Sequence, residues 1–384
     1  MNGRVGIVSM GFVGFRPSTP DLSFRELTYL AAKKAYDDVG IHPGDVDAFF
    51  CAEEDFWEGY SISDEYCNDQ MGAVLKPVQT IPGDFIQALA NGLMQIRTGM
   101  SRLVVIESHC KASNLVNHDA VLSFAYDPAL ARQLRQTPHF AAGLEMQRYL
   151  FESGATREHC ARVVVKNRSN AADNPNAGHA CELELGDILL ARPVADPLGR
   201  LDIAPHSDGA VIAVLAEERL ARELSHRPIW IEGIGWGTET NALETREWGR
   251  DHGTELAADM AYRMAGIRTP SQEIDVLEID DTYSYRELMA YESLRLCARG
   301  DGWKLVEQGR TERGGDLPVN VSGGSMGVGH LLDCTGGQKV LEIFTQLRGE
   351  AGARQIQDAE VGLAHAWRGV PTTTSAVALL SNLD

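Results

Sequence analysis

An internal repeat limits the fold of this chain more than any other feature of its sequence. An apolar segment, a helix with apolar spacing and a second apolar segment follow one another at residues 5–12, 27–41 and 45–50. The same order returns about 225 residues later, at 229–236, 256–267 and 273–279. The two helices end in V-G-I-H-P and A-G-I-R-T-P, each with Gly as a C-cap and Pro soon after.

The later part of each half also matches. A long apolar helix precedes a central strand at 86–99 and 103–109, and again at 338–352 and 361–367. Strands that alternate with helices predict an α/β fold with helices over largely parallel sheets. We predict an N-terminal half at 1–222 and a C-terminal half at 223–384, joined by a charged helical segment at 217–227. Coincidence between two ordinary βαβ units is the alternative. An insertion at about 113–184, rich in polar residues and turn formers, is interpreted as a loop subdomain that covers substrate.

Charge and apolar pattern exclude several classes. Lys and Arg number 35 against 54 Asp and Glu, a net charge of −19, which disfavours a nucleic-acid binder. No apolar run approaches the ~18–20 residues of a membrane span, and residues 1–11 lack the features of a signal peptide. We expect a cytoplasmic protein. The seven cysteines form no C-x-x-C pair and predict reduced thiols, and no local ligand spacing indicates a metal.

The repeat also predicts where a site lies. Superposing the two long helices places Pro82-Gly83 roughly opposite His330-Leu331. Helix N-termini carry partial positive charge and unpaired N–H groups. Two such ends that face each other would make a pocket for developing negative charge.

Four strings in order carry a family resemblance. They are V-V-V-K-N-R-S-N-A-A-D-N-P-N-A, D-P-L-G-R-L-D-I-A-P-H-S-D-G-A, P-V-N-V-S-G-G-S-M-G-V-G-H and L-R-G-E-A-G-A-R-Q, starting at Val163, Asp196, Pro318 and Leu347. Over nearly the whole chain the sequence resembles the thiolase superfamily, and it looks closest to the bacterial and archaeal branch similar to sterol-carrier-type thiolases. The resemblance implies a duplicated fold of α-β-α-β-α layers.

The chain departs from that family where the family does its chemistry. The nucleophilic cysteine of thiolases falls at Pro82, within about two residues, and no cysteine lies between Cys67 and Cys110. Proline removes both the thiol and a backbone N–H of the oxyanion hole. The family's G-H-P-x-G-A-T-G is here G-H-L-L-D-C-T-G from Gly329, its E-x-H-D-x-F is E-I-D-D-T-Y from Glu278, and the last loop, R-G-V-P-T-T-T-S, lacks C-x-G.

Losing an activated nucleophile typically costs about 10⁴–10⁶ in rate, which disfavours acyl transfer at this position. A retro-aldol cleavage needs only a base for a β-hydroxyl proton and donors for the enolate that forms on the thioester oxygen. Some thiolase-like proteins are aldolases of this type, and the sequence resembles them. We therefore predict a carbon–carbon lyase for 3-hydroxyacyl-CoA thioesters. Two alternatives are a thiolase with a non-standard nucleophile, Cys334, and a non-catalytic scaffold subunit.

The resemblance assigns His330 to an oxyanion or proton-transfer role. Tyr283 replaces the family's Phe as a possible acid or base, and Tyr285 competes with it on the same face of an extended segment. Asp280 and Asp281 would orient His330 or a water, or else cap a helix. The remaining candidates are glycines that let the backbone approach substrate and a histidine before the last loop: Gly83, Gly324, Gly329, Gly369 and His365.

No covalently bound cofactor is expected, since coenzyme A enters as part of the substrate. The resemblance implies a homodimer and a small companion subunit with an OB fold and a zinc ribbon, together a heterotetramer. The acyl group stays open. Phe56, Trp57 and Tyr60 are candidates for an apolar pocket, although surface or dimer contacts fit them equally well.

Overall fold

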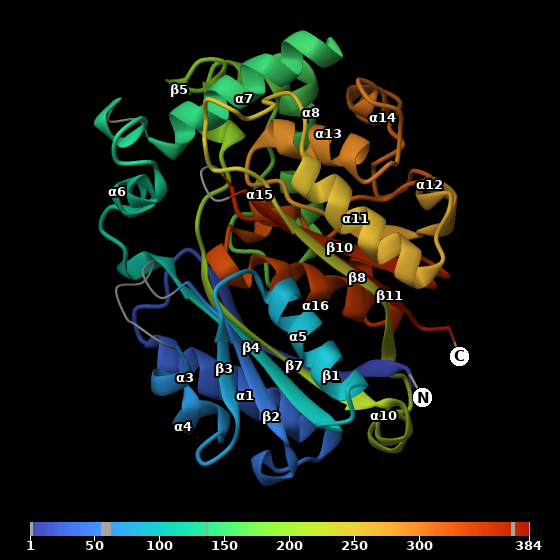
Figure 1. The fold of residues 1–384 in the computed structure, drawn as a ribbon. Coiled ribbons are helices and arrows are strands. Elements are labelled where there is room, and N and C mark those ends of the chain that lie inside the picture. Colours follow the sequence, from blue (N-terminus) through green and yellow to red (C-terminus); the bar gives the residue numbers. More distant parts are fainter. Residues whose placement is uncertain (1–2, 55–62, 135–136, 370–372, 384) are drawn as a thin grey trace.

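A computed structural model describes residues 3–54, 63–134, 137–369 and 373–383 (Figure 1). Phe56, Trp57 and Tyr60 lie outside these residues. Nine strands form one sheet in the order β3-β2-β4-β7-β1-β8-β11-β10-β9. Their bounds are β1 (Val5–Arg16), β2 (Ala48–Ala52), β3 (Val78–Ile81), β4 (Leu103–Lys111), β7 (Asp208–Glu217), β8 (Ile229–Thr238), β9 (Val276–Glu278), β10 (Val361–Trp367) and β11 (Thr374–Ser381), with a separate hairpin of β5 (Pro193–Ala195) and β6 (Leu198–Gly199).

Apart from β3, the sheet order is symmetric about the seam between β1 and β8. Outward from that seam, β7, β4 and β2 on one side match β11, β10 and β9 on the other. The seam is short and antiparallel, with Gly6 opposite Trp230 and Ile7 opposite Ile229. The helices repeat in the same way: α1 (Phe24–Val39) matches α11 (His252–Ala265), and α5 (Phe85–Arg97) matches α16 (Thr335–Leu347). The limits of the halves at residues 222 and 223 stay a prediction.

Alternating side chains of the strands divide the core into layers. Val104, Ile106 and Ala213 pack with α5 and α16 in one cluster, whereas Val105 and Ile212 pack with α1 in another. In the second half, Ala364 and Ala366 face the central cluster, and Leu363 and Val377 face α11. The central helices therefore lie between the two halves of the sheet, and the α-β-α-β-α arrangement is confirmed (Figure 1).

The predicted helix ends are also found. Ser23 caps α1 in a capping box with Glu26, and Gly40 ends the helix at φ 66°. Asp251 caps α11, and Gly266 ends it at φ 79°. Because both glycines adopt the left-handed conformation that other residues avoid, each sets where its chain turns toward the next strand.

Two expectations are corrected. The sheet is mixed: β2 pairs in parallel with β3 and β4, and β9 with β10, whereas the other pairs are antiparallel. The last strand of each half, β7 or β11, runs antiparallel to the strand before it in the same half of the sheet, β4 or β10. The alternation of helices and strands in the sequence does not reveal this reversal. The insertion is not chiefly loop, since it contains the long helices α7 (Pro138–Ser153) and α8 (Arg157–Asn170).

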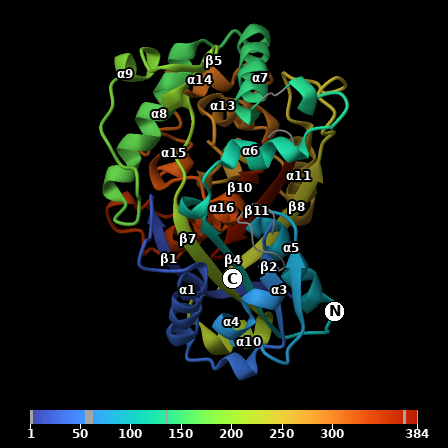
Figure 2. The ribbon, with the colours of Figure 1, turned by 90° about the vertical axis from the view of Figure 1, so that its left-hand side faces the viewer.

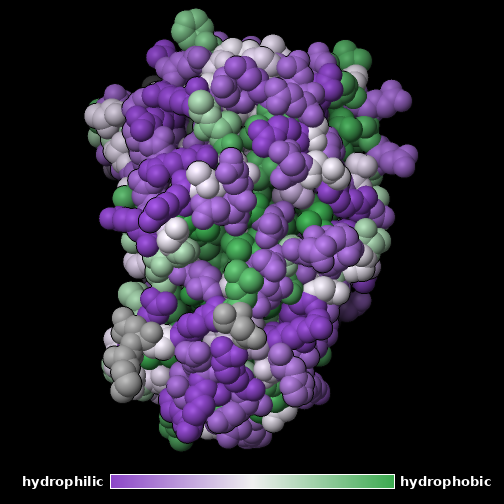
Figure 3. All heavy atoms as spheres, turned by 90° about the vertical axis from the view of Figure 1, so that its right-hand side faces the viewer, coloured by the Kyte–Doolittle hydropathy of each residue, from purple (hydrophilic) through white to green (hydrophobic). Residues whose placement is uncertain are grey.

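Shorter helices connect these elements, and the predicted joining segment contains α10 (Glu218–Leu224). The others are α3 (Ser63–Tyr66), α4 (Asn68–Met71), α6 (His118–Leu122), α9 (Leu185–Leu189), α12 (Pro270–Glu273), α13 (Ser284–Ser293), α14 (Gly302–Glu307) and α15 (Gly324–Val328). Figure 2 shows α6 in front of the sheet and α7 above it. Within the described ranges, no helix combines the length and apolar character needed to span a bilayer. Figure 3 shows one largely hydrophilic face with apolar residues gathered near its middle.

Candidate active site

One cavity contains two of the chemically capable side chains that the sequence singled out, His330 and Tyr283. Its walls come from both halves of the repeat and from the insertion, which contributes residues of α6 and α7. The lining residues are His118, Leu122, His139, Ile203, Ala204, His206, Thr282, Tyr283, His330, Trp367, Arg368 and Gly369. His330, Tyr283 and Gly369 are therefore brought together.

Tyr283 takes part in a chain of polar contacts. It is the N-cap residue of α13, and its side chain is buried. Its hydroxyl lies 3.1 Å from Nδ1 of His139, whose Nε2 lies 3.4 Å from Oδ1 of Asp119. If Nε2 carries the proton that faces Asp119, Nδ1 accepts from the Tyr283 hydroxyl. Burial raises the pKa of Tyr283 and lowers that of His139, with Asp119 opposing the latter shift. A substrate proton taken up by the phenolic oxygen can therefore pass on to His139.

His330 is held by its backbone. Its N–H donates to the Pro205 carbonyl at 2.7 Å, and its carbonyl accepts from the Ser207 N–H at 3.1 Å. Nδ1 of its ring has no hydrogen-bond partner among the described residues. Burial, with the neighbouring His206, lowers the pKa of His330 well below its usual value, so the imidazole is neutral at pH 7. A neutral imidazole with an open nitrogen fits a hydrogen-bond donor to developing negative charge.

Two further histidines surround His330, and sequence reasoning missed their part in the site. The His206 ring centroid lies 5.5 Å from that of His330 and 4.4 Å from that of His118. Burial lowers the pKa of His206 to about 4 and that of His118 to about 3. His118 and His139 lie in the part of the insertion before Val163, which matches no family string, and His206 lies before β7 in the string that starts at Asp196. Only the folded chain brings them together.

The acidic pair after β9 does not orient His330. The Asp281 carboxylate accepts from the N–H groups of Ser325 (2.6 Å) and Met326 (3.0 Å), so it caps α15. The Asp280 carboxylate accepts from the N–H (3.0 Å) and the hydroxyl (3.1 Å) of Thr282. The capping interpretation therefore fits Asp281, although the helix that it caps lies more than forty residues further along the chain.

Tyr285 and His365 are engaged elsewhere. Tyr285 lies within α13 rather than on an extended segment with Tyr283, and its hydroxyl donates to Glu145 at 2.7 Å. His365 has Nε2 3.1 Å from the Thr254 hydroxyl, and its Nδ1 accepts from the Asp280 N–H at 3.3 Å. Neither residue lines the cavity.

The glycines of the G-G-S-M-G-V-G run serve packing. A Cβ on Gly324 would meet the Asp281 carboxylate at 2.3 Å, and one on Gly329 would meet the Ser207 hydroxyl at 2.0 Å. Both have positive φ, 56° and 114°. Glycine at these positions therefore allows α15 to pack closely against Asp281, its capping residue, and the run ends directly before His330.

The starts of α5 and α16 do converge, but on a carboxylate of the chain itself. Asp84, the N-cap of α5, accepts from the Ile86 N–H at 2.9 Å and from the Gly336 N–H of α16 at 2.8 Å. The structure thus differs from the expectation of an open pocket at these ends. Gly83 precedes this cap, and a Cβ on it would meet Gln87.

The Asp84 carboxyl gives a pH prediction. Burial raises its pKa from 3.8 to about 6, against the two N–H bonds that lower it. The folded state then binds more protons than the unfolded state between these values, so the contribution of Asp84 to stability falls as pH rises through that window. Between about pH 4 and pH 7, the free energy of unfolding of the wild type should fall by up to ~3 kcal/mol relative to that of Asp84→Asn. Urea unfolding of both proteins measures this, and parallel pH profiles would contradict it.

Cys334, the alternative nucleophile, is a buried thiol. Its Sγ donates to the Ser108 carbonyl at 3.3 Å, and burial beside Glu107 raises its pKa well above the usual value. It does not line the cavity.

Comparison with known proteins agrees with this fold. Residues 235–382 match the family model of a thiolase C-terminal domain-like unit. An acetyl-CoA acetyltransferase of Methanothermobacter thermautotrophicus is 33% identical, with 90% of this chain and 91% of that protein covered. Sterol carrier protein 2 of Bos taurus is 29% identical, with 95% of this chain and 70% of that protein covered.

Solved structures complete the comparison. An Ltp2-ChsH2(DUF35) aldolase superposes with a TM-score of 0.85 at 25% sequence identity. The match covers 99% of this chain and 98% of the chain in that structure. Human mitochondrial 3-ketoacyl-CoA thiolase, at 16% identity and a TM-score of 0.74, shares the fold over 99% of this chain and 98% of its own. The chain belongs to the thiolase superfamily, in the branch similar to sterol-carrier-type thiolases.

Proposed function

We propose that this chain acts on CoA thioesters and cleaves a carbon–carbon bond of a 3-hydroxyacyl-CoA by a retro-aldol reaction. The observation that carries the proposal is the contact chain from Tyr283 through His139 to Asp119 in a cavity that no described cysteine lines. Relatives named as an acetyltransferase and as an aldolase support a CoA-thioester enzyme without deciding between these reactions.

In the first step the Tyr283 oxygen takes the proton of the substrate's 3-hydroxyl and passes its own proton to Nδ1 of His139. Asp119 stabilises the imidazolium that forms, since its carboxylate faces Nε2. The hydroxyl carbon becomes a carbonyl, and the bond between carbons 2 and 3 breaks. The electron pair of that bond moves into the thioester.

In the second step the thioester oxygen carries the enolate charge. The His330 imidazole, neutral and with its Nδ1 unpartnered among the described residues, donates an N–H to that oxygen. The proton held on His139 then returns through Tyr283 to carbon 2. The products are a shortened acyl-CoA and an aldehyde or ketone, and no acyl–enzyme bond is formed.

Acyl transfer is the second candidate, because of the 33% identity with an acetyl-CoA acetyltransferase. It requires a thiolate that attacks the 3-ketoacyl carbonyl. Cys334 is buried, donates to a backbone carbonyl and has a raised pKa, so it fits that role poorly.

The companion subunit and the homodimer belong to this proposal as well. A solved relative is an aldolase of Ltp2 with ChsH2(DUF35), which supports a partner for this chain. β3 is an edge strand of the sheet that the described residues form, and an edge strand is where a second copy can pair. Light scattering of the chain, alone and with the OB-fold protein encoded nearest to it, tests both assemblies.

The reaction is tested with a panel of 3-hydroxyacyl-CoA and 3-ketoacyl-CoA thioesters, each with the purified chain alone and with that companion. We expect a 3-hydroxyacyl-CoA to give a shortened acyl-CoA and a carbonyl compound in equal amounts, with no added CoA. CoA-dependent cleavage of a 3-ketoacyl-CoA, or an acylated peptide in the mass spectrum, would overturn the proposal.

Cys334→Ala gives a sharper separation of the two candidates. Because its thiol takes no part in the proposed steps, kcat/KM for the 3-hydroxyacyl-CoA should stay within about threefold, whereas loss of a thiolase nucleophile costs about 10⁴ or more. Steady-state assays of the two proteins decide this. A fall of several orders of magnitude in a folded variant would favour acyl transfer.

A further inference from the structure

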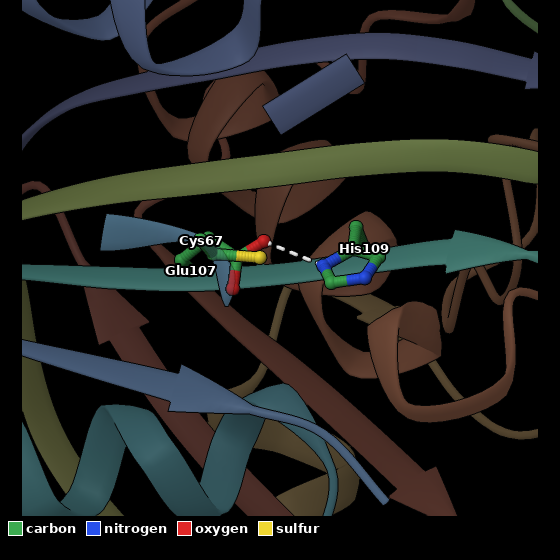
Figure 4. A group of neighbouring side chains, drawn as sticks. All are labelled: Cys67, Glu107 and His109. Atoms are coloured by element: carbon green, nitrogen blue, oxygen red, sulfur yellow. Dashed lines mark hydrogen bonds and ion pairs between the residues drawn. The ribbon is translucent and has the colours of Figure 1, made fainter. Parts of the chain in front are cut away.

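Side chains with metal-ligating atoms meet inside the first half, away from the residues that line the cavity. Glu107 and His109 lie two positions apart on β4 and so on one face of the strand. Cys67 is the N-cap residue of α4, and Glu53 directly follows β2. All four are buried. Figure 4 shows the Cys67 sulfur and the Glu107 carboxylate beside the imidazole of His109.

Their ligand atoms are close enough to share one ion. One atom each from Cys67, Glu107 and His109 lies within 4.8 Å of the others. Nδ1 of His109 is 2.8 Å from Oε1 of Glu107 and 3.7 Å from Oε2 of Glu53. Ligands of a four-coordinate zinc ion, with bonds of about 2.0–2.3 Å, lie roughly 3.3–3.8 Å apart. The separations of the ligand atoms here, from 2.8 Å to at most 4.8 Å, span the spacing expected around zinc.

Two carboxylates and a thiol lie around the imidazole of His109. The Thr28 hydroxyl donates to Oε1 of Glu107, and the Cys51 thiol also lies beside this carboxylate. Oε2 of Glu107 is fully buried and has no hydrogen-bond partner among the described residues. A buried carboxylate oxygen without a hydrogen bond destabilises the fold, because it has lost its hydration, and a bound cation would offset that loss.

We propose that Cys67, Glu107 and His109, with Glu53 as a fourth ligand, bind a divalent transition-metal ion of the zinc class. The mixed sulfur, nitrogen and oxygen set fits Zn²⁺ better than Mg²⁺ or Ca²⁺, which prefer oxygen alone. This inference is independent of the proposed lyase activity. No local spacing in the sequence indicates this site, because its ligands come from three separate segments.

A metal here would join β4 to the end of β2 through Glu53 and to the start of α4 through Cys67. Glu54, next in the chain, forms an ion pair with Arg368, and its N–H donates to Asp333 at 2.5 Å. Because Arg368 lines the cavity, occupation of the metal site would also help to fix one cavity wall.

The test uses the full chain after metal removal with a chelator, titrated with Co²⁺ and then competed with Zn²⁺. We expect one equivalent to bind, with the visible bands of four-coordinate cobalt and a thiolate-to-cobalt charge-transfer band. Cys67→Ser should abolish that band, and Glu107→Gln should weaken binding at least ~10-fold. Cys160→Ser, another buried cysteine in a different core cluster, is the matched control and should bind as the wild type does.

Alkylation of the wild type keeps the test decisive if a variant fails to fold. Because Cys67 is buried, the reaction is run in urea just below the unfolding transition, where Zn²⁺ should slow alkylation of Cys67 by iodoacetamide, as read by peptide mass spectrometry. Absence of stoichiometric binding, or an unchanged cobalt spectrum in folded Cys67→Ser, means an adventitious ion only and overturns the proposal. Zn²⁺ that binds without protecting Cys67 does the same.

Discussion

Tyr283→Phe is expected to lower kcat for 3-hydroxyacyl-CoA cleavage by ~10²–10⁴-fold, the usual effect of removing an acid–base group. The substitution deletes one oxygen and leaves the ring in place against Trp367, whose ring centroid is 6.4 Å away. Binding of the thioester does not depend on that oxygen, so KM should change little. Steady-state rates and urea unfolding of the purified variant separate lost chemistry from lost folding.

Tyr285→Phe is the matched control, since it makes the same change two residues along the chain. Its hydroxyl donates to Glu145, so the variant should lose ~1–3 kcal/mol of stability and keep its kcat. His139→Gln should cost about as much activity as Tyr283→Phe, and the double variant little more, because the two residues handle one proton. Additive losses, or an active Tyr283→Phe, would contradict the proton path.

Arg286→Met is expected to give the largest loss of stability, ~3–5 kcal/mol, without a direct effect on chemistry. Arg286 is 1% exposed and bonds both Glu145, at 3.2 Å, and Asp251. Its guanidinium also lies 3.8 Å over the Trp367 ring. Methionine fills most of the volume but leaves the two buried carboxylates without this cation. Urea denaturation at pH 7 measures the loss.

Arg148→Met provides the comparison on the surface. The Arg148 side chain is 55% exposed and pairs with Glu152 one helical turn away, so its removal should cost well under ~1 kcal/mol. Similar losses for the two arginine variants would show that the buried network around Arg286 contributes no more than an exposed pair.

Much of the fold could be predicted from the sequence, because each helix and strand of the repeat has a pattern that is visible within a short stretch of residues. The spacing of apolar residues located α1, α5, α11 and α16, and glycine followed by proline marked the ends of α1 and α11. Strand direction was not predictable, because the antiparallel return of β7 beside β1 depends on packing between segments some two hundred residues apart. The helices of the insertion were not predicted. Its many polar residues and turn formers indicated a loop, although the apolar residues of α7 have helical spacing.

The strings that carried the family resemblance prove mostly structural. Lys166 pairs with Glu287 at 2.7 Å, and Asn170 and Asn174 donate to the carbonyls of Asn320 (3.1 Å) and Ser322 (2.9 Å). These bonds hold the chain that leads to His330. Helix α8 fixes the spacing of Lys166 and Asn170, and Asn174 follows the turn after it, so a linear pattern reveals them.

The side chains around the cavity were harder to predict. Tyr283 and His330 were found because they occupy positions that the family uses. His118 and His139 come from the part of the insertion before Val163, where neither spacing nor resemblance offers a signal. His206 lies in the string from Asp196, to which the resemblance assigns no role at this position. Residues that meet only through tertiary structure leave no periodicity to detect.

Because α5 and α16 are buried against each other's half, neither half can cover its central helix alone. A half-length chain would expose the apolar face of that helix, and could hide it only by pairing with an identical copy about a two-fold axis. In the full chain this pairing is intramolecular, so the two halves need not be identical. The insertion of the first half supplies His118 and His139, and the second half supplies Tyr283 and His330.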